Sequence, residues 1–135
     1  MVERKRLKVG DKASARRVFT REDVVHFSGL SLDRNPIHLD EAFAAASVFG
    51  QPIVHGMLVA SLFSGLIGVE LPGEGSIYLG QNLRFKAPVP VGEEVTASVE
   101  IVKIRADKPI ITLRTLCLNH VGEIAIDGEA VVKVS

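Results

Sequence analysis

The sequence has little of several features that would place it in a specialised class of proteins. Its 135 residues contain one cysteine, Cys117, and 16 acidic residues balance 16 Lys and Arg. A single cysteine excludes an internal disulfide framework and is typical of a reducing compartment. Balanced charge does not favour nucleic-acid binding, which usually shows a basic excess. The first twelve residues also lack the apolar segment of a signal peptide. We therefore expect a cytoplasmic protein without a nucleic-acid partner.

The sequence also lacks an apolar run long enough to cross a membrane. Its longest run, "GMLVASLFSGLIGVEL", covers Gly56–Leu71. The helical part would be about 20 Å long, whereas a membrane span needs about 20 apolar residues. Apolar residues occur all round this run, so it predicts a helix buried inside a globular protein. The length of the chain predicts a single domain over residues 1–135.

The two halves of the chain differ in their predicted secondary structure. Lys12–Phe19 is typical of a short edge strand, and Thr20 caps a predicted helix over Arg21–Ser28. A second short helix is expected over His38–Ser47. Four β-branched segments follow, with turn-like residues between them: Ser76–Val89, Glu93–Ala106, Pro109–His120 and Glu123–Ser135. They predict an antiparallel meander with one face covered by the apolar helix, which is an α+β fold.

The predicted central helix carries small residues at spacings of three and four. These positions share one face of the helix: Ser61, Ser64, Gly65 and Gly68. Each glycine inside a helix costs about 1 kcal/mol relative to alanine, so a close neighbour is expected along this face. Either the sheet packs tightly against it, or part of a ligand passes along it.

Gly56 falls in the first turn of this helix. Backbone N–H groups there have no intrahelical partner, and the helix dipole favours negative charge at this end. These donors would stabilise an oxygen that gains charge during a reaction. The neighbouring His55 is interpreted as structural, as most isolated histidines are.

Asp33 and His38 flank an Asn35–Pro36 turn in "LDRNPIH". The proline holds Asn35 extended, and the turn can bring the two side chains into one pocket. A carboxylate and an imidazole can share one water molecule, one accepting a proton while the other donates one. Alternatively, Asp33 forms an Asx-turn and His38 belongs to the start of a helix.

A longer pattern, "FSGLSLDRNPIHLDEAFAA", surrounds these two residues. Its informative positions are Phe27, Leu30, Ser31, Asp33, Asn35, Pro36, Ile37, His38 and Ala44. At these positions the pattern resembles the hydratase signature of the MaoC-like, or (R)-specific enoyl-CoA hydratase, family. Leu32 departs from that signature, because most members have glycine there. "PIVHGMLVASLFSGLIG" and the segment after Gly75 are also similar, so the resemblance covers about Arg21 to Val134.

The resemblance implies a hot-dog fold, in which a long antiparallel sheet wraps around a central helix. It also implies a homodimer with CoA-ester sites near the subunit interface. The implied reaction is reversible hydration of a trans-2-enoyl-CoA to an (R)-3-hydroxyacyl-CoA, as in the small bacterial enzymes that supply polyhydroxyalkanoate synthesis. No metal or other cofactor is expected.

The family also implies roles for five residues. Asp33 would be the general base, His38 would orient the water, and the Gly56 N–H would bind the thioester oxygen. Ser64 would support the dyad, line the substrate pocket or simply pack the helix. Ile67, three residues further on, would close the pocket and favour acyl chains of about four to six carbons.

Two other functions fit the same fold. A hot-dog thioesterase would hydrolyse a similar ester, but it usually depends on a carboxylate placed elsewhere. A non-catalytic acyl-CoA-binding protein would keep the fold without the chemistry. The Asp33–His38 pattern favours the hydratase over both.

Overall fold

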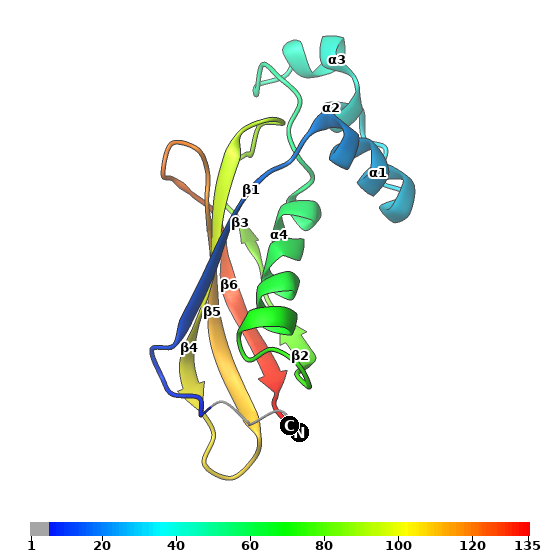
Figure 1. The fold of residues 1–135 in the computed structure, drawn as a ribbon. Coiled ribbons are helices and arrows are strands. Elements are labelled where there is room, and N and C mark those ends of the chain that lie inside the picture. The colour runs from blue at the N-terminus through cyan, green and yellow to red at the C-terminus, as the bar shows by residue number, and fades with distance from the viewer. Residues whose placement is uncertain (1–5) are drawn as a thin grey trace.

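The computed structural model describes residues 6–135 and contains one six-stranded antiparallel sheet with helices on one side (Figure 1). The strands are β1 (Lys12–Val18), β2 (Ile77–Gln81), β3 (Arg84–Phe85), β4 (Glu94–Ile104), β5 (Ile110–Leu118) and β6 (Ile124–Lys133). The helices are α1 (Arg21–Ser31), α2 (Pro36–Leu39), α3 (Glu41–Ala45) and α4 (Gly56–Gly65), which continues into the π-helical turn η1 (Leu66–Glu70).

The sheet is a meander only in part. Its order is β1-β4-β5-β6-β2, and β3 also pairs with β6. The expected meander is therefore confirmed for β4 to β6 but wrong for the segment before them. Pro88 and Pro90 lie between β3 and β4, and this connection is longer than a tight hairpin allows. As predicted, β1 is an edge strand, paired on one side with β4.

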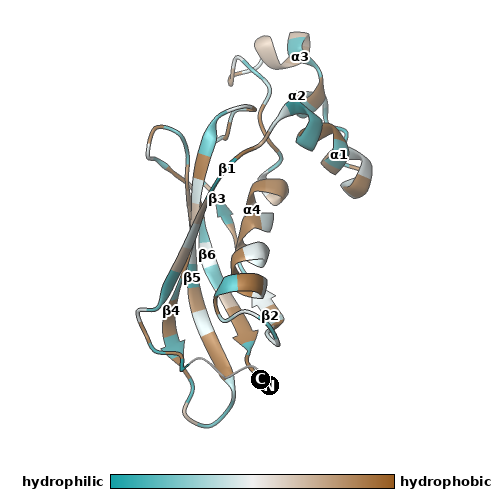
Figure 2. Cartoon of the chain, viewed as in Figure 1, coloured by the Kyte–Doolittle hydropathy of each residue, from teal (hydrophilic) through white to brown (hydrophobic). Residues whose placement is uncertain are grey.

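Helix α4 lies along one face of the sheet, while α1 to α3 project beyond one end of it (Figure 1). Val59, Phe63 and Ile67 are each 1% exposed and pack with the inward-facing residues of β4, β5 and β6. Hydrophobic residues predominate along α4 in Figure 2. A curved antiparallel sheet around a central helix confirms the predicted hot-dog fold. Among residues 6–135, no helix is long and apolar enough to cross a membrane.

The small-residue face of α4 points away from the sheet. Ser61, Ser64, Gly65 and Gly68 are all exposed. A Cβ added at Gly65 or Gly68 would meet no atom within 4 Å. The expectation that this face packs against the sheet is therefore wrong for this chain, because the larger residues of the helix occupy that position instead.

The local signals at the short helices are mostly confirmed. Thr20 and Asp23 form a reciprocal capping box at the start of α1, which extends to Ser31 rather than ending at Ser28. The helix expected over His38–Ser47 is divided in two. Its middle residue, Asp40, is extended, and its Oδ1 accepts the N–H of Phe43 at 3.0 Å. Asp40 therefore ends α2 and begins α3.

Leu32 ends α1 in an unusual backbone conformation. Its φ is 68°, the left-handed region that favours glycine, and it is the one non-glycine residue with positive φ among those described. Its side chain is 71% exposed, so burial compensates little for the unfavourable backbone. Most members of the family that the sequence resembles have glycine at this position, and the backbone here adopts a conformation that glycine favours.

Replacing Leu32 with glycine should stabilise the protein. The left-handed conformation costs a non-glycine residue about 1–2 kcal/mol, and the greater freedom of glycine in the unfolded chain offsets part of this. We expect the free energy of unfolding in urea to rise by about 0.5–1 kcal/mol. Leu32→Ala is the control, because it removes the same side chain but keeps the Cβ. Equal stabilisation by both substitutions would show that backbone strain is not the cause.

Candidate active site

Asp33 uses its two carboxylate oxygens differently. Oδ1 accepts the N–H of Asn35 at 3.2 Å, which is an Asx-turn. Oδ2 lies 3.9 Å from Nε2 of His38. The Asx-turn and a catalytic role of Asp33 are therefore compatible, because the turn leaves the second oxygen facing the imidazole. The Asp33 side chain is 50% exposed, so solvent reaches this carboxylate.

His38 is oriented by the segment that precedes α4. Its Nδ1 lies 2.7 Å from the carbonyl oxygen of Ile53. A carbonyl oxygen only accepts, so we assign the proton to Nδ1. In the neutral ring, Nε2 is then a free acceptor that faces Asp33. The imidazole is 8% exposed, so its orientation is set by the protein.

The gap between Asp33 and His38 suits a single water molecule. A separation of 3.9 Å is too long for a direct hydrogen bond. Oδ2 and Nε2 are both acceptors, whereas water has two hydrogens to donate. A water bound between them would donate one hydrogen to each group. Its oxygen lone pairs would then be free to attack an electrophile.

Gly56 begins α4, as predicted. The first N–H groups of a helix have no intrahelical partner, and His55, the residue before Gly56, provides no side-chain cap for them. Glycine at this position also leaves space for the ring of Phe85. A Cβ on Gly56 would lie 2.6 Å from two ring carbons of Phe85. Phe85 can approach the start of the helix only because that side chain is absent.

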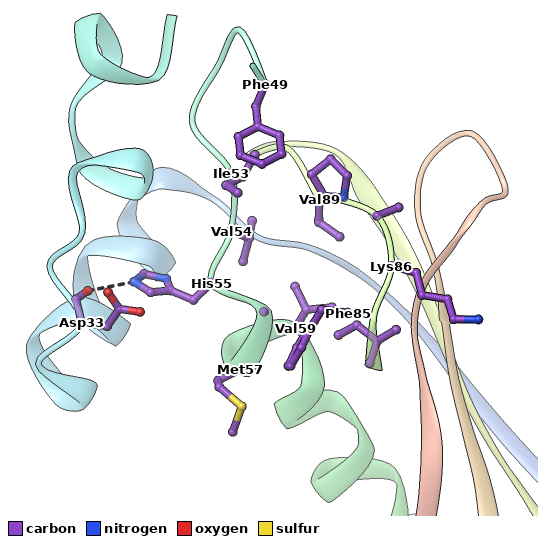
Figure 3. A pocket seen from close by; sticks show the side chains of 14 residues that line it. Asp33, Phe49, Ile53, Val54, His55, Met57, Val59, Phe85, Lys86 and Val89 are labelled. Carbon is purple, nitrogen blue, oxygen red and sulfur yellow. Dashed lines mark hydrogen bonds between the residues drawn. The ribbon is translucent and has the colours of Figure 1, made fainter. Parts of the chain in front are cut away.

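A pocket of about 490 Å³ is lined by Asp33 and Gly56 but not by His38. Asp33 and His55 lie on one side of it, and the remaining wall is mainly apolar (Figure 3). Lys86 lies at its edge and pairs with Asp127 at 3.3 Å. The apolar residues of the wall are Phe49, Ile53, Val54, Met57, Val59, Phe85, Ala87, Pro88, Val89 and Ile126. An apolar pocket with a few convergent polar groups is typical of a small-molecule site.

Three residues expected in the site do not line this pocket. His38 contacts two residues that do, because its Nε2 lies 3.9 Å from Oδ2 of Asp33 and its ring stacks on that of His55. Ser64 is exposed on α4, and Ile67 is buried in the core below it. Ile67 follows Gly56 by eleven residues, which corresponds to about 16 Å along the helix axis. Asp33, His38 and Gly56 are thus brought together, while the assignments of Ser64 and Ile67 remain predictions.

His55 contributes more to the site than the sequence indicated. It is 2% exposed, and its ring stacks on that of His38 with centroids 3.8 Å apart and an angle of 25°. Its Nε2 lies 3.0 Å from both the carbonyl oxygen of Asp33 and Oγ of Ser28. Burial lowers the pKa of His55 below its ordinary 6.5, more than its hydrogen bond to Asp33 raises it. A histidine directly before the glycine was the only signal in the sequence.

The same three side chains have the composition of a metal site but not its geometry. One ligand atom from each of Asp33, His38 and His55 lies within 4.8 Å of the other two. An imidazole binds zinc in its own plane at about 2.0–2.1 Å. Two nearly parallel rings 3.8 Å apart do not share a point that satisfies both. The cluster therefore fits a water site better than a metal site.

Comparison with known proteins agrees with the fold and with the sequence pattern. A curated (R)-specific enoyl-CoA hydratase of Aeromonas caviae is 59% identical over 128 residues, covering 95% of this chain and 96% of the relative. An (R)-specific enoyl-CoA hydratase of Rhodospirillum rubrum is 43% identical, covering 95% and 88%. A solved structure described as the (R)-hydratase from A. caviae involved in PHA biosynthesis superimposes with a TM-score of 0.94. The two sequences are 58% identical, and the superposition covers 96% of this chain and 98% of the solved chain.

The family model described as the MaoC like domain matches residues 5–117. This range includes the Asp33–His38 turn, α4 and most of the sheet. The chain therefore belongs to the MaoC-like domain family.

Proposed function

We propose that this chain is an (R)-specific enoyl-CoA hydratase, a hydro-lyase that reversibly adds water to a trans-2-enoyl-CoA. One observation carries the proposal: Oδ2 of Asp33 and Nε2 of His38 lie 3.9 Å apart, a separation that one water hydrogen-bonded to both would bridge. Two relatives that share 59% and 43% identity carry this activity in their names. The structural relative described as involved in PHA biosynthesis supports a role in supplying polyhydroxyalkanoate precursors.

In the proposed mechanism, Asp33 and His38 hold the water beside C3 of the substrate. Asp33 acts as general base and takes a proton as the water oxygen bonds to C3, while His38 orients the water. The electron pair of the C2–C3 double bond moves toward the thioester, whose oxygen gains charge near the N–H of Gly56. The proton taken from the water is then delivered from the Asp33–His38 pair to C2, which completes the 3-hydroxyacyl-CoA and restores the Asp33 carboxylate. These steps use only side-chain and backbone groups, so the proposal includes no metal or cofactor.

A cytoplasmic location belongs to the same proposal. It is supported by the single cysteine, Cys117, because a lone free thiol is typical of a reducing compartment. Burial raises the pKa of Cys117 to about 11, so the thiol is protonated at neutral pH and has little nucleophilic character.

Incubation of the purified protein with crotonyl-CoA tests the function. A hydratase consumes the conjugated enoyl absorbance and keeps the thioester, and chiral analysis should identify the (R)-3-hydroxy product. A thioesterase would release free CoA, which a thiol reagent detects. A binding protein would change neither signal. Release of free CoA without hydration, or no reaction, would overturn the proposal.

Substitution of either proposed catalytic side chain should abolish most turnover. Asp33→Asn and His38→Gln should each lower kcat by about 10²–10⁴, the usual contribution of a positioned acid or base. Asn keeps an oxygen that can accept the Asn35 N–H, so the turn should persist. Asp40→Asn is the matched control, because this exposed carboxylate caps α3 and does not line the pocket. Near-normal activity in a folded Asp33 or His38 variant would contradict the assignment.

We also propose that Ser64 and Ile67 contribute to the acyl site and that Ile67 limits chain length. Ile67 is 1% exposed, so its removal would open space that is now filled. Wild type should prefer enoyl-CoAs of about four to six carbons, because each longer chain must displace a branched side chain with few rotamers.

Ile67→Ala should shift kcat/KM toward longer acyl chains, measured over a series from four to about twelve carbons. The substitution should also lower the free energy of unfolding by about 2–5 kcal/mol. Ile101→Ala is the control, since it makes a comparable cavity in the core on β4. An unchanged profile in folded Ile67→Ala would place the acyl chain elsewhere.

The two edges of the sheet support the proposed homodimer. Edge strand β1 carries charge at Lys12, Arg16 and Arg17, and charged edges discourage pairing with another chain. In contrast, β2 contains no charged residue, and its apolar side chains are exposed: Ile77 by 55%, Tyr78 by 38% and Leu79 by 52%. An antiparallel contact between two copies of β2 would cover these side chains and extend the sheet.

Light scattering at micromolar concentration should therefore give twice the mass of one chain. Leu79→Glu should shift the protein toward the monomer, because a twofold contact would place the new charge close to its symmetry mate. Val18→Glu, on the opposite edge strand β1, should leave the mass unchanged. A fully active wild-type monomer would rule out the dimer as a requirement of the site.

A further inference from the structure

The proposed mechanism leaves one buried polar side chain of the pocket without a role. His55 contacts α1 and α2 as well as the turn at Asp33. Its ring stacks on His38 and meets the Phe27 ring edge-on at 4.9 Å. Because His55 directly precedes Gly56, one residue touches the region of the proposed base and adjoins the proposed oxyanion donor.

The hydrogen bonds of His55 identify which of its nitrogens carries the proton. The Asp33 carbonyl oxygen, 3.0 Å from Nε2, can only accept, so Nε2 must donate. Nδ1 is then the unprotonated nitrogen. It is buried and has no hydrogen-bond partner within residues 6–135. Protonation of Nδ1 would create a second N–H without an acceptor, which is costly in a buried position.

The titratable groups that face this ring are His38 on α2 and Asp33 in the turn before it. Burial lowers the pKa of His55 most, and the charge of protonated His38 lowers it further. Hydrogen bonding to the carbonyl of Asp33 and the charge of its carboxylate act in the opposite direction. The neutral ring with its proton on Nε2 agrees with both the contacts and the direction of this shift, so His55 is poorly suited to transfer protons during turnover.

We propose that His55 is a positioning residue, whose Nε2–H holds the main chain of Asp33 while its ring supports the face of the His38 imidazole. This role rests on the proposed hydratase function. Asp33 lies just after the strained Leu32, and its side chain is half exposed. The bond to its carbonyl therefore ties a loosely covered turn to the start of α4. Because Gly56 is the next residue, the same bond sets the proposed base relative to the oxyanion donor.

Two substitutions of His55 separate its hydrogen bond from its ring. His55→Gln places an amide donor near the former Nε2 and removes the ring. His55→Phe keeps an aromatic ring and removes the donor. We expect His55→Phe to lower kcat by about 10²-fold, the scale of a 1 Å misplacement, with little change in KM. His55→Gln should keep at least about ten times more activity than His55→Phe, even if its Tm is the lower of the two.

The ranking of the two variants distinguishes positioning from packing. If His55 only packs, activity will follow thermal stability, and the variant that keeps the ring will be the more active one. That result, or wild-type kcat in His55→Phe, would overturn the proposal. Ser28→Ala is the control, because it removes the other partner of Nε2 and leaves the Asp33 contact in place. It should retain near-normal kcat.

Two measurements test the role without relying on turnover. The ¹⁵N chemical shifts of wild-type His55 at neutral pH should show a protonated Nε2 and an unprotonated Nδ1. Hydrogen exchange at the Asn35 amide, which donates to Asp33, should be faster in His55→Phe than in His55→Gln. A proton on Nδ1, or equal exchange in both variants, would overturn the role of His55. Failure of the wild type to hydrate crotonyl-CoA would overturn the proposed function instead.

Discussion

The geometry of the site depends on one hydrogen bond, from Nδ1 of His38 to the carbonyl oxygen of Ile53 at 2.7 Å. It sets the tautomer of the imidazole and therefore the direction in which Nε2 accepts. It also joins α2 to the extended segment that leads into α4, where the N–H of Ile53 donates in turn to the carbonyl of Ile37. These contacts bring residues from 33 to 38 beside Gly56, although some twenty residues separate them in the chain. Together with the bond from His55 to the carbonyl of Asp33, this junction holds the carboxylate, the imidazole and the helix N-terminus in one place.

Asp33 illustrates why a structural and a catalytic interpretation need not compete. A carboxylate has two oxygens, and here each has its own geometry. Oδ1 closes the Asx-turn, while Oδ2 remains available beside His38. The turn restricts the side chain without occupying the oxygen that would do chemistry. A short motif of this kind can therefore combine rigidity with an accessible acceptor, and the same division occurs in His38, which uses one ring nitrogen for orientation.

The features that the sequence predicted well depend on local rules. The Thr20–Asp23 capping box, the start of α4 at Gly56 and the turn at Asn35–Pro36 all follow from neighbouring residues. The order of the strands was predicted less well. β2 pairs with β6, which is far from it in the sequence, and no local signal specifies that pairing. The role of His55 could not be predicted locally either, because its hydrogen-bond partners, Asp33 and Ser28, lie 22 and 27 residues away. Periodicity identified the small-residue face of α4 but could not tell whether it faces the sheet or the solvent.

That exposed face has a consequence for how the protein folds. Gly56, Gly65 and Gly68 give the α4–η1 segment a low intrinsic helix propensity, and a helix of ten residues is marginal in water even with better formers. Its stability must come from burial of Val59, Phe63 and Ile67 against strands that are synthesised after it. The helix is therefore expected to persist only once β4 to β6 have assembled, which requires non-local contacts and slows folding. A nascent chain that ends before β4 would carry every residue of the proposed dyad and oxyanion site, yet it would lack the surface that holds them together.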